Sequence, residues 1–202
     1  MKIFETTMAP NTRRVRIFLA EKGIEMEYVQ LDLQKGDNLS AEFRAMNPMA
    51  KVPVLELDDG SYLSESVAIC RYFEELHPEN PLFGSTPLEK AQIEMWNRRA
   101  ELNFLMPTGM AFQHTTGFFA DRMTPNKEWG EDCKKSTEGF IRFLDKHLAD
   151  SEYVAGKNYS IADISVLCTL DFAKVIGIRP TPEQENVIRW YKAVSSRPSA
   201  KA

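Results

Sequence analysis

The sequence predicts an α/β part at the N-terminal end of the chain and an all-helical part after it. Over residues 1–77, apolar residues follow strand and helix periods in the order strand, helix, strand, short helix, two strands, helix. Residues 78–87 contain three prolines and one glycine, which is typical of a linker. Residues 88–202 show helical patterns only. We therefore expect two domains joined by a short linker at these boundaries.

The first half of the α/β part is predicted to be a strand–helix–strand unit. Residues 2–6 form a short strand pattern, and Pro10 suits the first turn of a helix because that position needs no N–H donor. The helix is expected to end at Lys22-Gly23, since glycine is favoured just past a helix end. From Met26 to Asp32, apolar and polar residues alternate as they do in a half-buried strand.

The second half of this part is predicted to be a hairpin between two helices. Ser40 is placed to cap a short helix through its hydroxyl group. Asp58-Asp59-Gly60 separates strand patterns at 54–57 and 61–63, and it is a strong hairpin signal. A helix over about 66–76 completes the unit.

The all-helical part is predicted to be a bundle around one buried helix. Residues 161–175 are apolar on nearly every side, which indicates the centre of the bundle. Before them, Ser160 and Asp163 have the spacing of a capping box, in which hydroxyl and carboxylate each bond a backbone N–H. The other predicted helices cover 88–120, with a bend near Pro107 and Gly109, then 129–148 and 183–196.

The composition excludes several kinds of partner and location. The 202 residues carry 25 Lys plus Arg against 29 Asp plus Glu, and a weakly acidic chain without a basic run argues against nucleic acid and anionic membranes. No segment approaches the roughly 18 apolar residues of a membrane span, and the start does not resemble a signal peptide. We expect a cytoplasmic protein. Three widely separated cysteines fit no disulfide framework, and no metal is expected.

Two short segments predict a site for a small zwitterionic peptide. The stretch 49–55 contains an extended X-Pro edge, where the backbone N–H and C=O of Val52 can pair with a peptide as an added strand. In 63–66, Glu65 and Ser66 open a helix whose N–H groups and dipole favour a carboxylate, while Glu65 suits an ammonium group. A cap without a ligand is the alternative role for Ser66.

These features resemble the cytosolic glutathione transferase family over nearly the whole chain, with theta-like and nu-like bacterial features. The resemblance implies a glutathione transferase fold, with a thioredoxin-like domain over 1–77 and a helical bundle over 88–202. It also implies glutathione as co-substrate and a homodimer. Four features carry it in order: Asn47-Pro-Met-Ala-Lys-Val-Pro53, Leu63-Ser-Glu-Ser66, the proline-rich linker and Tyr159-Ser-Ile-Ala-Asp163.

The resemblance implies roles for individual residues in binding glutathione. Val52 would hold the cysteinyl part through its backbone, next to a cis Pro53. Ser66 would bind the γ-glutamyl carboxylate, and Glu65 would accept from the ammonium group.

At the other end of glutathione, the resemblance nominates Asn38 for the glycyl carboxylate, with Lys51 adding positive charge. The alternatives are a turn role for Asn38 and a solvated position for Lys51.

The usual catalytic side chain of the family is missing from the sequence. Ala9 stands where several classes place Ser or Cys, and no Tyr occurs a few residues earlier, where other classes place it. A helix N-terminus lowers the pKa of a nearby thiol, so the helix at Pro10 can stabilise a thiolate. Asn11 or Thr7 is the expected hydrogen-bond donor to sulfur, with Thr12 as a further hydroxyl. The alternative role for Asn11 is bonding to its own backbone.

A hydrophobic second substrate is expected to contact a Met- and Phe-rich segment after the linker, since soft side chains suit a varied apolar pocket. Ordinary core packing is the alternative. The candidate residues are Phe104, Met106, Met110 and His114.

Three functions fit the sequence. The leading hypothesis is attack of the glutathione thiolate on a hydrophobic electrophile, as in detoxification. The second is reduction of disulfides or peroxides, with a second glutathione as the resolving thiol. The third is a non-enzymatic interaction or stress-regulatory protein. For the expected homodimer, Met49 is the candidate contact, and a solvent-exposed loop position is its alternative.

Overall fold

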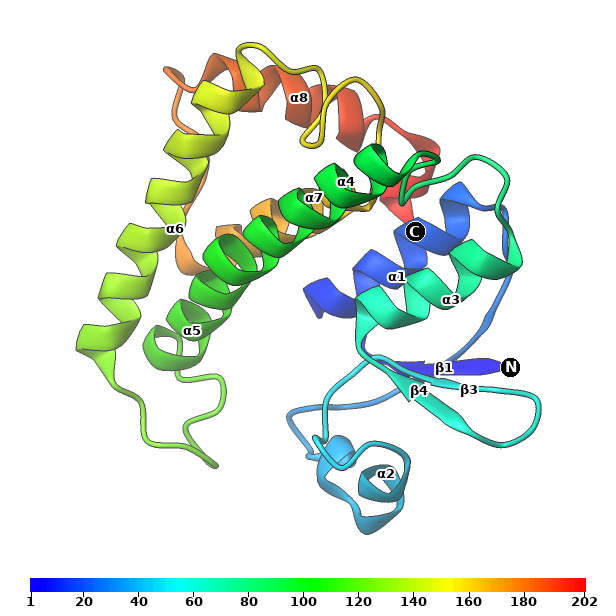
Figure 1. Ribbon diagram of the computed structural model, residues 1–202. Coiled ribbons are helices and arrows are strands. Elements are labelled where there is room, and N and C mark those ends of the chain that lie inside the picture. The colour runs from blue at the N-terminus through cyan, green and yellow to red at the C-terminus, as the bar shows by residue number, and fades with distance from the viewer. The chain divides into compact units, whose positions relative to one another are not determined.

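The computed structural model describes residues 1–202 and divides the chain into two compact units (Figure 1). The first unit contains Met1–Asn80 together with Lys201–Ala202, and the second contains Pro81–Ala200. The division falls inside the proline-rich segment 78–87. No helix of either unit combines the length and apolar character needed to cross a membrane.

The first unit is built on a four-stranded sheet in the order β2-β1-β3-β4. β1 pairs with β2 in parallel and with β3 in antiparallel orientation, and β3 and β4 form the antiparallel hairpin predicted around Gly60. Gly60 has a φ of 83°, which glycine adopts without strain. The strands are β1 (Lys2–Glu5), β2 (Glu27–Gln30), β3 (Val54–Glu56) and β4 (Tyr62–Ser64).

Helices cover both faces of this sheet. α1 (Pro10–Glu21) and α3 (Ser66–Leu76) lie side by side on one face, and α2 (Ala41–Met46) lies on the other (Figure 1). On the α2 face, Phe43 meets Phe4 edge-on at 6.5 Å between ring centroids. The strand–helix order predicted for this part is therefore confirmed.

Local signals explain how these elements begin and end. Ser40 accepts a hydrogen bond from the N–H of Phe43 at 3.1 Å and caps α2 as predicted. α1 begins at Pro10 as expected, and its chain turns at Gly23, where φ is 66°. The Val52–Pro53 peptide bond is cis, as the resemblance implied.

The second unit is entirely helical apart from an isolated bridge between Tyr153 and Gly156. Every residue from Ile161 to Leu170 is buried, which confirms the predicted central helix. The α-helices are α4 (Pro87–Ala100), α5 (Met106–Thr115), α6 (Lys127–Leu148), α7 (Ile161–Ala173) and α8 (Glu185–Ser195). Shorter helical segments are η2 (Glu101–Leu105), η3 (Lys174–Ile176) and η4 (Pro198–Lys201), whose last residue belongs to the first unit, and η1 (Asp37–Leu39) lies in the first unit.

The single long helix predicted over 88–120 is wrong in detail. Five residues of π-helix, Glu101–Leu105, separate α4 from α5. Pro107 is the second residue of α5, and a proline cannot donate the hydrogen bond that a continuous helix needs at that position. The helix also ends early, at Thr115, before Gly117 with a φ of 75°.

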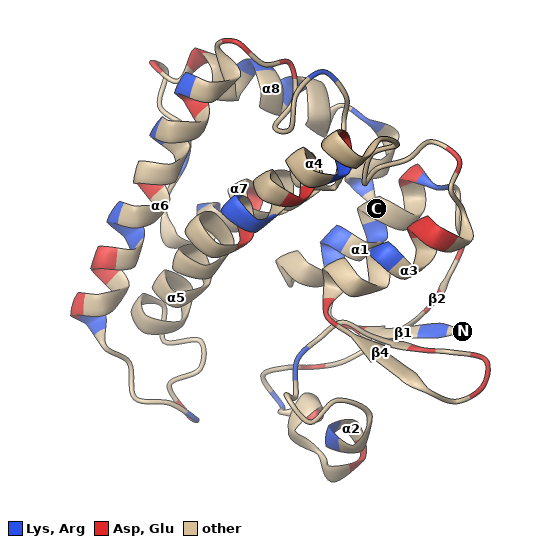
Figure 2. Cartoon of the chain, in the orientation of Figure 1, with Lys and Arg blue, Asp and Glu red and all other residues tan.

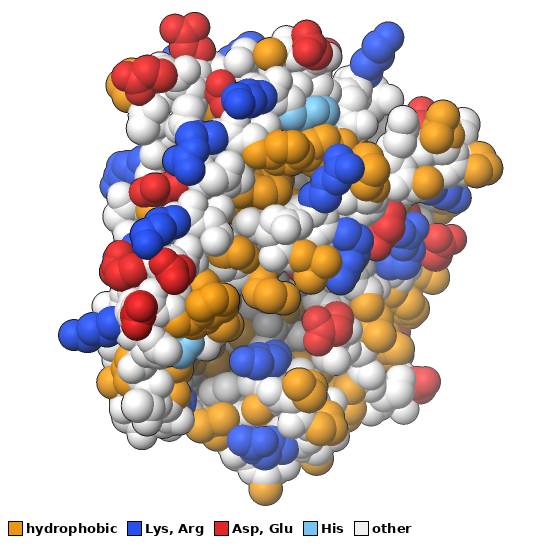
Figure 3. All heavy atoms as spheres, turned by 60° about the vertical axis from the view of Figure 1, so that its left-hand side comes forward, with side chains coloured by type: hydrophobic (Ala, Val, Ile, Leu, Met, Phe, Trp, Pro, Cys, Tyr) orange, Lys and Arg blue, Asp and Glu red, His pale blue; other side chains and the backbone are white.

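Charges of both signs alternate along the exposed face of α6 (Figure 2). Lys134 pairs with Glu131 at 2.9 Å, and Lys135 pairs with Asp132 at 2.8 Å. Figure 3, which is turned to bring that side forward, shows the same alternation at its left. This face carries no large region of one sign that would attract a polyanion.

Candidate functional site

The start of α3 provides an uncapped helix N-terminus. Glu65 occupies the N-cap position with a φ of 69°, which is unusual for a residue other than glycine, and its side chain makes no capping hydrogen bond. The Glu65 side chain is exposed, whereas Ser66 is only 5% exposed. The first N–H groups of α3 therefore lack a side-chain cap, and a ligand anion is a suitable acceptor for them.

Val52 lies just before the strand pairing begins. β3 starts at Val54, which pairs with Ser64 at the end of the hairpin. The N–H and C=O of Val52 make no hydrogen bond within the chain, so they are free to pair with an added peptide strand. The neighbouring Lys51 has an exposed side chain, and its carbonyl accepts from Asn47 Nδ2 at 2.8 Å.

Asn38 supports the backbone next to this segment. Its Nδ2 donates to the carbonyl of Ala50 at 2.8 Å, and its Oδ1 is buried without a hydrogen-bond partner. Ala50 has a φ of 52°, a conformation that needs support from its surroundings. Asn38 thus uses one amide hydrogen inside the protein, as the turn role predicts, and its contact with a ligand stays a prediction.

The N-terminus of α1 is also uncapped. Ala9 is its N-cap residue and has no side-chain acceptor to offer, while Pro10 has no N–H. The N–H groups of Asn11 and Thr12 make no hydrogen bond within the chain. Two backbone donors are therefore available at the positive end of the α1 dipole.

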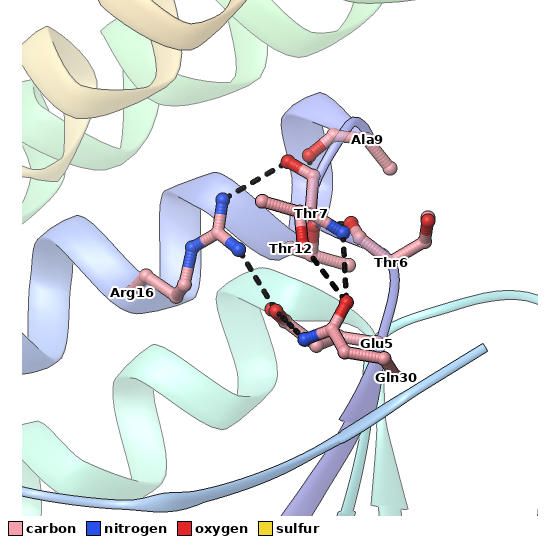
Figure 4. A network of polar contacts seen from close by, with 7 residues as sticks. All are labelled: Glu5, Thr6, Thr7, Ala9, Thr12, Arg16 and Gln30. Atoms are coloured by element: carbon pink, nitrogen blue, oxygen red, sulfur yellow. Dashed lines mark hydrogen bonds and ion pairs between the residues drawn. The ribbon is translucent and has the colours of Figure 1, made fainter. Parts of the chain in front are cut away.

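The threonine hydroxyls near this helix start are engaged inside the protein (Figure 4). Thr7 donates to Gln30 Oε1 at 2.8 Å. Thr12 donates to the carbonyl of Thr6 at 2.6 Å and lies 2.8 Å from the carbonyl of Ala9. Because a hydroxyl has one hydrogen, neither threonine hydroxyl has a spare hydrogen to donate in this arrangement.

A polar network around buried Glu5 holds the segment between β1 and α1 (Figure 4). Glu5 is 1% exposed, and its Oε1 lies 2.8 Å from Arg16 Nη1 and 2.7 Å from Gln30 Nε2. Arg16 also donates from Nη2 to the carbonyl of Thr7 at 3.0 Å. Sequence reasoning missed this network, because Glu5 and Gln30 belong to different strands and show no pattern that links them.

Asn11 and Ser66 come together from α1 and α3. The distance from Ser66 Oγ to Asn11 Oδ1 is 3.5 Å, although 55 positions separate the residues. Asn11 Nδ2 has no hydrogen-bond partner within the chain. Arg14, which sequence reasoning did not select, donates from Nη1 to Ser66 Oγ at 2.8 Å. The three side chains form one polar group between two uncapped helix N-termini.

The residues proposed for the second substrate have different surroundings. Phe104 is fully buried and stacks on Phe140 at 5.0 Å, so it belongs to the core of the helical unit. Met106 is 52% exposed, and Met110 and His114 follow at intervals of four residues on the same face of α5. His114 Nδ1 accepts a hydrogen bond from the N–H of Asn126 at 3.1 Å.

Comparison with known proteins assigns the chain to a family. Residues 9–76 match the model for the N-terminal domain of glutathione S-transferases, and residues 97–198 match the model for the C-terminal domain. The chain belongs to the glutathione S-transferase family. Among members of this family, it is 40% identical over 205 residues to Glutathione S-transferase 2 of Saccharomyces cerevisiae, covering 100% of this chain and 88% of that relative.

A solved structure agrees with this assignment to the glutathione S-transferases, and a second group of relatives carries a different name. The crystal structure of Gtt2 from Saccharomyces cerevisiae superposes with a TM-score of 0.95 at 40% identity, covering 100% of this chain and 99% of that one. Elongation factor 1-gamma 2 of Oryza sativa subsp. japonica is 32% identical over 194 residues, which cover 95% of this chain. The chain spans only 45% of that elongation factor subunit.

Proposed function

We propose that this glutathione transferase binds glutathione between Val52 and the start of α3 and forms its thiolate at the start of α1. Val52 pairs with the cysteinyl backbone through its unused N–H and C=O. The γ-glutamyl carboxylate accepts from Ser66 and the uncapped N–H groups of α3, while exposed Glu65 accepts from the ammonium group. Asn38 and Lys51 are the candidates for the glycyl carboxylate.

The observation that carries the proposal is the uncapped start of α1. A free thiol has a pKa of about 8.5, and a helix N-terminus lowers it by favouring the charged form. The N–H groups of Asn11 and Thr12 are without partners, and the Asn11 side-chain amide is equally unused. Asn11 is a better candidate than Thr7 for the donor to sulfur, because the Thr7 hydroxyl donates to Gln30.

The reaction then needs little further chemistry from the protein. The thiolate attacks an electrophilic carbon of a hydrophobic acceptor, forming a carbon–sulfur bond while the leaving group departs with its electron pair. Holding the thiolate in place and charged supplies most of the rate enhancement. Met106, Met110 and His114 remain candidates for contact with the acceptor. A role in detoxification, a homodimer and a cytoplasmic location complete this proposal.

A second reaction, thiol–disulfide exchange with glutathione alone, is favoured by the placement of the protein thiols. Cys70, Cys133 and Cys168 are all buried, so none is exposed to form a mixed disulfide. The bound glutathione thiolate would attack a substrate disulfide, forming a glutathione mixed disulfide and releasing one thiolate. A second glutathione thiolate would then attack this mixed disulfide, forming oxidised glutathione and releasing the other thiolate. Parallel assays with an aryl halide and with a glutathione mixed disulfide distinguish the two reactions.

The test of the proposed function combines binding with the thiolate absorbance of bound glutathione. Calorimetry on the wild type, Ser66→Ala and Glu65→Gln is expected to show glutathione binding that either substitution weakens. Asn11→Ala is expected to raise the pKa of the bound thiol by about one unit, which is the loss of one hydrogen bond to a charged group. Thr7→Val is the matched control and is expected to change this pKa less.

Two results would contradict the proposal. A folded wild type that binds no glutathione at millimolar concentration removes both enzyme functions. An unchanged thiol pKa in Asn11→Ala removes Asn11 as the donor and leaves the backbone N–H groups of α1 as the stabilising groups.

A further inference from the structure

Arg14 is a buried cation that points at the proposed ligand site. It is 1% exposed and lies on α1, where its Nη1 donates to Ser66 Oγ at 2.8 Å. Its Nε is buried without a hydrogen-bond partner. The guanidinium group therefore lies next to the hydroxyl of Ser66, the first residue of α3.

Arg14 differs from the other buried cations of this unit in having no carboxylate partner. Arg16 pairs with Glu5 at 2.8 Å, and Lys22 pairs with Glu74 at 2.6 Å, with both side chains of the second pair less than 10% exposed. Arg14 has only the neutral Ser66 hydroxyl. Burying a charge without a counter-ion is unfavourable, so a nearby anion would relieve this cost.

The surroundings of Ser66 define where that anion can lie. Ser66 Oγ accepts from Arg14, so its own hydrogen is left to donate, and its only acceptor in the chain is Asn11 Oδ1 at 3.5 Å. A carboxylate at the start of α3 can take this hydrogen together with the uncapped N–H groups. Arg14 then faces the anion across Ser66, at a depth where water screens little of its charge.

We propose that Arg14 is a specificity-determining residue that supplies, through Ser66, the counter-charge for the α-carboxylate of the γ-glutamyl group. The inference rests on the proposed function, because it takes glutathione as the ligand at Ser66. Arg14 polarises and orients the Ser66 hydroxyl and makes the site prefer a peptide that carries this carboxylate. Arg14 acts by position and charge, and the reacting sulfur is not its target.

The test compares glutathione with an analogue in which hydrogen replaces the α-carboxylate of the γ-glutamyl residue. Dissociation constants of both peptides are measured by calorimetry for the wild type, Arg14→Met and Arg14→Lys. Arg13→Met is the matched control, since Arg13 is the adjacent, less buried arginine of α1. Circular dichroism and thermal unfolding establish that each variant is folded.

We expect Arg14→Met to weaken glutathione binding by roughly 10- to 100-fold, the usual effect of a lost interaction with a charged group. The same variant should change the affinity for the analogue by less than about twofold, since the analogue lacks the α-carboxylate that Arg14 is proposed to stabilise. Arg14→Lys should recover part of the glutathione affinity, and Arg13→Met should resemble the wild type.

Equal weakening of both peptides in Arg14→Met would overturn the inference, because it would assign Arg14 a purely structural role. A wild type that binds both peptides equally would overturn it without any variant. A wild type that binds neither peptide contradicts the proposed function itself and is thereby distinguished from failure of the inference alone.

Discussion

Gln30 Oε1 accepts two hydrogen bonds from Thr7, one from the N–H at 3.2 Å and one from the hydroxyl at 2.8 Å. Gln30 also donates to buried Glu5, so it connects β2 to the segment between β1 and α1. That segment sets where α1 begins and hence where Asn11 lies. The proposed thiolate site thus depends on residues that never touch the ligand.

Gln30→Leu should therefore impair catalysis more than binding. The change removes the single acceptor of both Thr7 hydrogen bonds and one donor to Glu5, while Ser66 and Val52 are not altered. We expect kcat to fall by about tenfold, equivalent to one lost hydrogen bond of about 1.4 kcal/mol, with a smaller rise in KM for glutathione. Thr7→Val removes only the hydroxyl bond and should have a weaker effect. Equal kcat values for Gln30→Leu and wild type would contradict this role.

Ala9→Ser should stabilise the free protein. Ala9 has the extended backbone of an N-cap, with φ of −83° and ψ of 136°, and a serine hydroxyl there can accept from the free N–H groups of α1. A serine cap in place of alanine stabilises by about 1 kcal/mol, and Ala9→Gly should gain most of this, since glycine at an N-cap is only a few tenths of a kcal/mol less favourable than serine. Urea unfolding of the free protein measures the difference. A serine variant no more stable than the wild type would show that the start of α1 cannot use a cap.

If the chain forms the proposed homodimer through this loop, Met49→Asp should weaken self-association. Met49 is 68% exposed in the single chain, and an exposed apolar side chain at this loop suits a contact with a second copy. A charge at a buried contact would have to be desolvated, so we expect the sedimentation coefficient to fall toward that of the monomer. Met8→Asp is a suitable control because Met8 is also exposed, at 85%. An unchanged sedimentation coefficient for Met49→Asp would exclude this residue from the interface.

Local signals in the sequence predicted much of the fold. Pro10, Ser40 and the turn at Gly60 act on the backbone within a few residues, so their effects can be inferred without the tertiary structure. The cis bond before Pro53 was predicted from a motif of the family rather than from periodicity.

The polar part of the site depends on contacts between distant residues. Arg13-Arg14 in sequence is typical of an exposed helix face, yet Arg14 is buried because it meets Ser66, 52 positions away. In the same way, the sequence predicts that the Thr7 hydroxyl can donate to a ligand, whereas in the structure this hydroxyl donates to Gln30. Side chains that bond across elements can be assigned only when both elements are placed.

Asp163 is the group whose titration should be visible in the stability of the protein. Its carboxylate is fully buried and accepts from the N–H of Val154 at 2.9 Å, from Ser160 and from Trp190 Nε1 at 2.8 Å. Burial raises the pKa of Asp163 from 3.8 to about 6, although these hydrogen bonds favour the charged form. The folded state therefore binds more protons than the unfolded state between these two values.

The sign of the effect follows from this difference in proton binding. Stability contributed by Asp163 is greatest below about pH 4 and falls as the pH rises toward 6, by roughly 3 kcal/mol at most. Asp163→Asn cannot ionise, and its single amide oxygen can replace only one carboxylate oxygen, so the donors to the other oxygen, such as the Ser160 N–H, lose their acceptor at a cost of about 1–3 kcal/mol each. The variant should thus be less stable than wild type near pH 4. The difference between the two free energies of unfolding should become smaller as the pH rises to 7. Urea unfolding of both proteins across this pH range measures the difference in free energy of unfolding. A difference that does not change with pH would show that Asp163 titrates normally in the folded protein.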